Sequence, residues 1–258
     1  MRHADGHRRM PLPATLVAVA GSLVLLLAAP AAGHQNGTPN DPPQVDHSNI
    51  PDTSYWPGQY GVPWNGWRVY LSPAHHWSGY KYGCNYFDDS GRWVQYIEDL
   101  NMKDAAFEAA IGAGWDLMNR GYYVRVGAAD PDENTTRSNG WGPASKRRHI
   151  PMHSNASSNA PCPNGGADGT RVFYCSSGGA DLAAELAYTI GASSPGSPDV
   201  TVPQPCSSAF YEIRKTTAVT AYLETEFHTW YSGTAWLTDY ETWAWRVGWA
   251  VDRHLGYP

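Results

Sequence analysis

The chain has 258 residues and a formal net charge of −6 at pH 7. This length is sufficient for one domain with a full hydrophobic core. The acidic balance argues against a nucleic-acid-binding protein, because that binding depends on Lys and Arg side chains that neutralise phosphates.

The N-terminal segment has the residue order of a secretory signal peptide. A head with three arginines precedes an uncharged apolar run over residues 16–29, and small residues follow. The run is too short for a membrane span. We therefore predict a signal peptide over residues 1–32, with an uncleaved membrane anchor as the alternative. Cleavage would remove three arginines and one aspartate, which changes the formal charge from −6 to −8, and the secreted chain would not insert stably in a membrane.

Four cysteines follow the predicted signal peptide: Cys84, Cys162, Cys175 and Cys206. In an exported protein this even number favours two disulfides, for which three pairings are possible. We favour Cys162 with Cys175, because the Pro-Asn-Gly-Gly run over residues 163–166 is a turn signal between short arms. The alternative, a zinc site formed by cysteines, lacks the close spacing of a zinc knuckle.

Residues 33–54 are polar and predict a flexible leader, and an aromatic-rich catalytic domain is expected over residues 55–258. Apolar residues at helical spacing predict helices over 99–120, 181–190, 207–214 and 238–255. Short apolar runs predict strands over 67–71, 122–126, 148–152, 171–174 and 219–223, and polar stretches predict loops over 127–147 and 193–205. Strands that alternate with helices indicate an α/β fold. We predict a single domain in which helices flank a largely parallel mixed sheet.

Three of the predicted strands are followed by residues that can bind a metal ion or transfer a proton. His75 and His76 follow the first strand, His153 follows the strand over 148–152, and Glu224 follows the last strand. In open α/β sheets, ligands and reactive groups gather outside the carboxyl ends of the strands. The sequence therefore predicts one site at this edge of the sheet, built from distant segments.

Four segments, in order, resemble the motifs of the zinc-dependent N-acetylmuramoyl-L-alanine amidases of the amidase-3 type. Residues 69–76 resemble a strand followed by Asp-Pro-Gly-His-Gly, and residues 98–101 resemble a Glu that opens a helix shortly before an Asn. Residues 150–156 resemble Ser-Ile-His-Ala-Asn-Ala, and residues 223–227 resemble Val-Glu-Thr-Gly-Phe. The resemblance covers the chain from Trp67 to the C terminus.

The resemblance implies that His75, Glu98 and His153 bind zinc at the carboxyl ends of the strands, and that Glu224 is the catalytic carboxylate. Catalytic zinc sites commonly have three His or carboxylate ligands and a fourth position for water. Zinc lowers the pKa of this water to about 7 and polarises the scissile carbonyl. A carboxylate beside the water can take its proton and pass it to the amide nitrogen.

Departures from the motifs leave alternatives for these ligands and add candidates for substrate binding. His76 stands where the motif has Gly, so it could replace His75 as the ligand or bind substrate. Glu98 lies one residue nearer the Asn than in the motif, and Asp99 is its alternative. Arg214 could bind or orient substrate, or form a salt bridge on a helix.

Three further residues bear on the predicted site. Glu226 would share the face of Glu224 if the strand continues, and it is the competing candidate for the catalytic carboxylate. Ser72 stands where the motif has Asp, a carboxylate that could orient the first His. His149 begins its strand, away from the predicted site, and is expected to be structural.

These features predict a secreted, cell-wall-associated and monomeric zinc hydrolase. Its substrate would be peptidoglycan, and it would cleave the amide bond between N-acetylmuramic acid and L-alanine. One alternative is a non-catalytic glycan-binding protein with a degraded, metal-free amidase site, since Trp and Tyr side chains are abundant and suit sugar rings. Another is a glycosidase with paired carboxylates, either Glu224 with Glu226 or Asp88 with Asp89.

Overall fold

The computed structural model describes residues 51–73, 81–87, 91, 93–98, 105–156, 162 and 169–257. The predicted signal peptide and most of the predicted leader lie outside these residues, as do His75, His76 and Asp99. Within the described ranges, no helix combines the length and the apolar character needed to cross a membrane.

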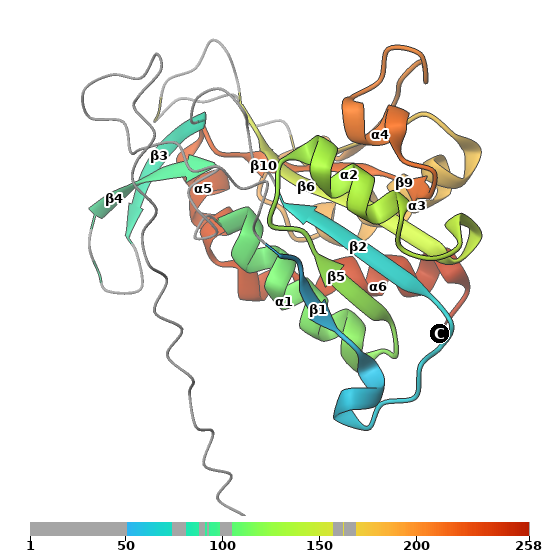
Figure 1. Cartoon of the computed structure of the whole chain (residues 1–258). Helices are drawn as coiled ribbons and strands as arrows, with labels where there is room; N and C mark the ends of the chain where they lie inside the picture. The colour runs from blue at the N-terminus through green and yellow to red at the C-terminus, as the bar shows by residue number, and fades with distance from the viewer. Residues whose placement is uncertain are drawn as a thin grey trace, which may run out of the picture.

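A mixed sheet forms the centre of the described domain (Figure 1). Its strands are β1 (Thr53–Tyr55), β2 (Arg68–Pro73), β5 (Tyr123–Val126), β6 (Arg147–Asn155), β7 (Arg171–Tyr174), β8 (Val200–Pro203), β9 (Val219–Thr220) and β10 (Tyr222–Phe227). Their order across the sheet is β1-β5-β2-β6-β10-β7-β8, with β9 beside β6. Strands β5, β2, β6 and β10 run parallel, whereas β1 is antiparallel to β5, and β7 is antiparallel to β10. The predicted α/β class with a largely parallel mixed sheet is confirmed.

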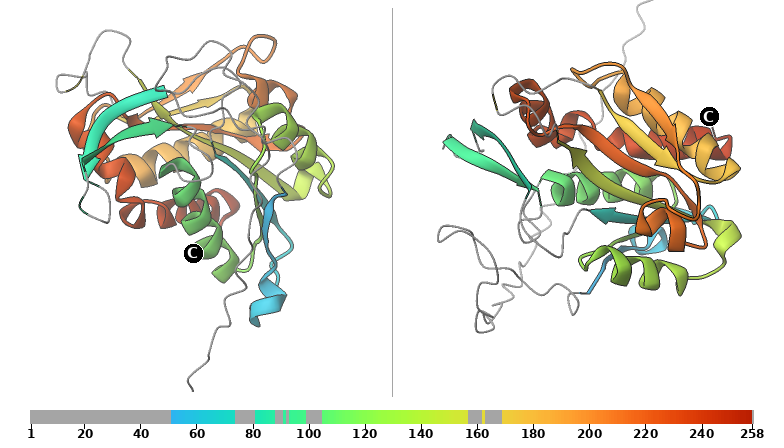
Figure 2. Two further views of the ribbon diagram at one scale, coloured as in Figure 1. Left: turned by 60° about the vertical axis from the view of Figure 1, so that its left-hand side comes forward. Right: turned by 90° about the horizontal axis from the view of Figure 1, so that it is seen from above.

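Helices cover both faces of this sheet (Figures 1 and 2). They are α1 (Ala105–Asn119), α2 (Pro131–Asn139), α3 (Ser177–Gly191), α4 (Tyr211–Lys215), α5 (Tyr231–Thr238) and α6 (Trp245–Leu255), with 3₁₀ turns at Pro57–Tyr60, Ala144–Lys146 and Tyr240–Thr242. The main hydrophobic core lies on the face of α1, α3 and α6, where Leu71, Ile150 and Leu223 from the strands meet Leu186 and Val251 from the helices. Helices α2 and α4 lie on the opposite face, nearer the viewer in Figure 1.

Helix α2 lies within a stretch for which the sequence predicts a loop, residues 127–147, and that prediction is wrong here. Its nine residues are polar, so they lack the apolar spacing from which a helix is predicted. Proline and two acidic residues occupy its first turn and Arg137 its last, an arrangement that suits the helix dipole. Its buried residues are Asn134, Thr135 and Ser138, so the helix packs on the sheet through polar groups.

Strands β3 (Lys81–Phe87) and β4 (Trp93–Glu98) form a separate antiparallel hairpin between β2 and α1. The sequence did not predict this hairpin, nor β8, which lies in the stretch over 193–205 that was predicted as a loop. The helix predicted over 99–120 is described from Ala105 onward, and residues 99–104 lie outside the described part.

The structure pairs the four cysteines differently from the sequence prediction. The disulfides are Cys84 with Cys162 and Cys175 with Cys206. Strands β7 and β8 are parallel neighbours with Tyr174 opposite Pro203, so the residues that follow them lie close together. The Cα atoms of Cys175 and Cys206 are 5.0 Å apart. The predicted pair of Cys162 with Cys175 is wrong, because a turn signal reports proximity along the chain and not the pairing of strands.

Candidate active site

Three adjacent parallel strands, β2, β6 and β10, reach the same edge of the sheet. Pro73 at the end of β2 is opposite Met152 in β6, and Met152 is opposite Leu223 in β10. One residue further along the strands, His153 and Glu224 are direct register partners. Register partners in adjacent strands project from the same face, because side chains alternate along each strand. These two predicted site residues therefore lie side by side.

The described residues do not place the other two predicted ligands at this edge. His75 comes two residues after the end of β2 and, like its alternative His76, lies outside the described residues. Glu98 is the last residue of β4, where its partner is Lys81 of β3, and its side chain is not among the described ones. Glu98 therefore ends a strand, whereas the resemblance implies a Glu at the start of a helix.

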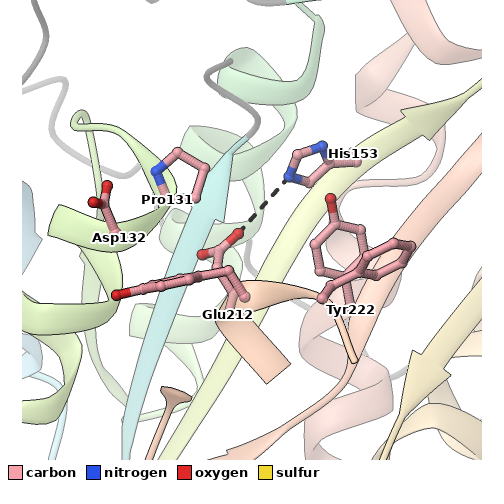
Figure 3. A pocket seen from close by; sticks show the side chains of 7 residues that line it. Pro131, Asp132, His153, Glu212 and Tyr222 are labelled. Carbon is pink, nitrogen blue, oxygen red and sulfur yellow. Dashed lines mark ion pairs between the residues drawn. The ribbon is translucent and has the colours of Figure 1, made fainter. Parts of the chain in front are cut away.

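His153 has a buried and well-defined setting on β6, with 4% of its surface exposed. The ring of Tyr222 stacks on its imidazole, with ring centroids 4.6 Å apart and planes inclined by 24°. Glu212 of α4 points toward His153 (Figure 3), and its Oε2 lies 3.8 Å from Nε2 of the imidazole. The aromatic ring and the carboxylate together restrict the orientation of His153.

The carboxylate of Glu212 also contacts His149, since Nε2 of His149 lies 3.1 Å from Oε1. Burial by itself would raise the pKa of Glu212, but the hydrogen-bonding and charge interactions of its carboxylate with His149 and His153 outweigh burial and lower this pKa. Glu212 is therefore an ionised carboxylate between two imidazoles. The sequence hints at this arrangement only through His149 and His153, which lie four residues apart on one face of a strand.

Glu226 does not join this group, although the sequence made it the competitor of Glu224. The pairing of β10 with β6 shifts its register after Glu224, and Glu226 has a φ of 67°. That left-handed conformation favours glycine, the residue at this position in the motif that the segment resembles. The Glu226 carboxylate accepts hydrogen bonds from Oγ of Ser194 (2.8 Å) and the amide of Gly196 (2.9 Å), in the loop after α3. It anchors that loop, and Glu224 is the carboxylate beside His153.

Arg171 belongs to the same row of residues and was not indicated by the sequence. It is the register partner of Glu224 in the antiparallel strand β7. One row of register partners therefore crosses three strands. It contains the imidazole of His153 in β6, the carboxylate of Glu224 in β10 and the guanidinium of Arg171 in β7. The guanidinium also lies 5.6 Å from the centroid of the Phe227 ring. A guanidinium in this row could bind an oxygen atom of a substrate.

Ser72, where the resembled motif has Asp, is part of a hydrogen-bonded network between β2 and α2. The side-chain amide of Asn134 donates to Oγ of Ser72 (3.0 Å) and to the carbonyl of Ala129 (2.7 Å). The hydroxyl of Tyr70 donates to Oδ1 of Asn134 (3.2 Å). These bonds fix β2 against α2, and Ser72 itself supplies no carboxylate that could orient a histidine.

No family model matches the sequence, and no curated protein matches it. The N-acetylmuramoyl-L-alanine amidase AmiC2 of Nostoc punctiforme superposes with a TM-score of 0.55 at 17% identity, covering 75% of this chain and 99% of its own. The catalytic domain of the amidase CwlV from Bacillus (Paenibacillus) polymyxa var. colistinus gives 0.54 at 14% identity, covering 74% and 99%. The amidase Ami1 from Mycobacterium smegmatis gives 0.53 at 13% identity, covering 76% and 99%. The chain has the fold of N-acetylmuramoyl-L-alanine amidase catalytic domains.

The amidase fold here carries a pocket of about 400 Å³ beside His153 (Figure 3). It is lined by Pro131, Asp132, His153, Phe210, Tyr211, Glu212 and Tyr222. Arg214 lines a different pocket, of about 430 Å³, next to the disulfide of Cys175 and Cys206. Its guanidinium lies 5.6 Å from the centroid of the Tyr211 ring. The structure does not bring Arg214 into the pocket of His153, and a role in substrate binding stays a prediction.

Among the described residues of the amidase fold, no three His, Cys, Asp or Glu side chains are grouped so that they could hold a metal ion. Of the three predicted ligands, His153 is the one whose side chain is described. Its surroundings fit a ligand histidine, because a metal-bound imidazole commonly has a carboxylate near its other ring nitrogen. Glu212 occupies that place beside Nε2.

Proposed function

We propose that the mature protein is a secreted, cell-wall-associated, zinc-dependent N-acetylmuramoyl-L-alanine amidase. It would cleave the amide bond between the lactyl group of N-acetylmuramic acid and the L-alanine of the stem peptide. The observation that carries this proposal is the register of His153 with Glu224 in the adjacent parallel strands β6 and β10, in a chain with the amidase fold. An imidazole ligand and a carboxylate base side by side are the two groups that this hydrolysis requires.

In the proposed site, His75, Glu98 and His153 would hold the zinc ion, which would supply Lewis-acid polarisation of the scissile carbonyl and a water molecule of lowered pKa. The carboxylate of Glu224 would take a proton from the attacking water and deliver it to the amide nitrogen, which is a poor leaving group until it is protonated. Glu212 and Tyr222 keep the His153 ring in one orientation. Arg171 provides a positive charge beside Glu224, within the row that faces the substrate.

One of the two carboxylate pairs considered for a glycosidase, Glu224 with Glu226, is not supported. Glu224 and Glu226 would have to face the same substrate, but Glu226 is buried and bonded to the loop after α3. The second pair, Asp88 and Asp89, lies outside the described residues.

End-group analysis of digested peptidoglycan tests the proposed reaction directly. The amidase should release new L-alanine amino termini, should stop when a chelator is added, and should recover when zinc is restored. New reducing sugar ends would instead indicate a glycosidase. Binding to the wall without either kind of new end group would indicate a non-catalytic wall-binding protein.

A further inference from the structure

The β3–β4 hairpin is fixed to the sheet next to the candidate active site. The hydroxyl of Tyr96 in β4 is hydrogen-bonded to Oγ of Ser154 (3.0 Å), the residue that follows His153. Oγ of Ser154 is in turn 2.9 Å from Nδ1 of His228, and the amide of Cys84 in β3 donates to the carbonyl of His228 (2.8 Å). The hairpin is therefore held in a defined position beside the edge of the sheet at which His153 and Glu224 lie.

A pocket of about 490 Å³, which we call the hairpin pocket, lies between this hairpin and α5. Three of its four aromatic side chains are open to solvent: Phe87 is 68%, Trp93 is 53% and Tyr231 is 41% exposed, whereas Tyr86 is half-buried. The rings of Phe87 and Trp93 lie 4.6 Å apart, and those of Trp93 and Tyr231 lie 6.5 Å apart. Exposed aromatic groups that are clustered in this way commonly mark a binding site.

The polar groups of the hairpin pocket restrict the chemistry of its ligand. Asn85, Thr238 and Asp239 contribute an amide, a hydroxyl and a carboxylate. Among the described residues that line the pocket there is no Lys, Arg or His, and Asp239 contributes a carboxylate. The carboxylate of Asp239 disfavours an anionic ligand, such as the carboxylates of a stem peptide. The lining suits a neutral sugar, whose ring face can stack on an aromatic side chain while its hydroxyl and N-acetyl groups bond to the amide and the carboxylate.

We infer that the hairpin pocket binds a neutral N-acetylated sugar unit of a glycan strand. The inference rests on the proposed function in one respect: the adjacent sugar unit of the bound glycan strand, which carries the stem peptide, would lie at the row of His153 and Glu224. Figure 1 shows the hairpin and α5 together on the side of the molecule toward which the β2 arrow points. A glycan strand held there would lie along the edge of the sheet at which His153 and Glu224 lie.

Sugar binding is tested without reference to catalysis by calorimetric titration with a peptide-free β-1,4-linked N-acetylglucosamine oligosaccharide. The wild type should bind, and Trp93→Ala and Tyr231→Ala should each weaken the affinity by about 5- to 10-fold. Tyr188→Ala is the matched control, because Tyr188 is 60% exposed on α3 and lies outside the hairpin pocket. No binding by the wild type, or equal affinity in wild type and Trp93→Ala, would overturn the inference.

The link to the proposed function is tested with two substrates of different length. Trp93→Ala should raise KM for polymeric peptidoglycan by about 5- to 10-fold and leave hydrolysis of a single N-acetylmuramoyl peptide unchanged. Equal losses of hydrolytic activity on both substrates would contradict the proposal that the hairpin pocket binds the glycan strand. A wild type that binds the oligosaccharide but cleaves neither substrate would refute the amidase and leave sugar binding in place. A change of oligomeric state in Trp93→Ala, measured by light scattering, would show instead that the aromatic cluster is a self-association surface.

Discussion

Replacing Glu224 by Gln is expected to lower kcat for peptidoglycan hydrolysis by about 10²- to 10⁴-fold, the usual contribution of a general acid–base residue. The amide keeps the size of the carboxylate but cannot take a proton from water. Glu224 is half-buried in β10, so an isosteric replacement should preserve the fold. The measurement is the rate at which L-alanine amino termini are released from purified peptidoglycan.

Glu226→Gln is the matched control, because it makes the same chemical change two residues further along β10. Its carboxylate accepts bonds from Ser194 and Gly196, so this variant should lose about 1–3 kcal/mol of unfolding free energy and keep most of its kcat. Undiminished activity of the Glu224 variant, or an equal loss of kcat in both variants, would contradict the catalytic role of Glu224.

Replacing Glu212 by Ala is expected to reduce the free energy of unfolding by about 3–5 kcal/mol, the usual cost of removing one partner of a buried ionic pair. The change leaves the buried imidazoles of His149 and His153 without their carboxylate. Chemical denaturation should be measured in the presence of a chelator, so that metal binding does not add to the measured stability.

Two further variants separate the ionic contribution of Glu212 from other effects. Glu212→Gln retains an oxygen acceptor for His149, and a smaller loss of about 1–3 kcal/mol is expected. Glu133→Gln removes a carboxylate that is 42% exposed and pairs with Arg137, so its effect should stay within about 0.5 kcal/mol. If the unfolding midpoint of Glu212→Ala equals that of the wild type, Glu212 does not stabilise the two histidines.

The sequence was sufficient to predict the strands that carry the candidate site. Strands β2, β6 and β10 lie in the parallel part of the sheet and are largely buried, and each contains a short apolar run, at residues 69–71, 150–152 and 222–223. Because parallel neighbours end at one edge, the residues after these runs could be assigned to one site. In the structure His153 and Glu224 are register partners in adjacent strands, and their role in one site stays a prediction.

What the sequence could not show depends on contacts between distant segments. Arg171 joins the row through the antiparallel register of β7 with β10, which no local pattern encodes. Glu212 lies in a helix of five residues, and its role follows from how α4 packs over β6. Glu226 was placed on the site face by strand alternation, and the left-handed backbone at this residue breaks that alternation. Helix α2 was missed because its buried face is polar.

The central claim, that segments far apart in the chain meet around one zinc ion, is tested most directly by metal analysis. Protein purified without added metal should contain about one zinc per chain, as expected for a catalytic zinc site. His153→Ala should lose the metal at chelator concentrations that leave the wild type loaded, while its far-ultraviolet circular dichroism stays that of the wild type. A wild type that holds no zinc, or equal zinc retention in the two proteins, would contradict the account.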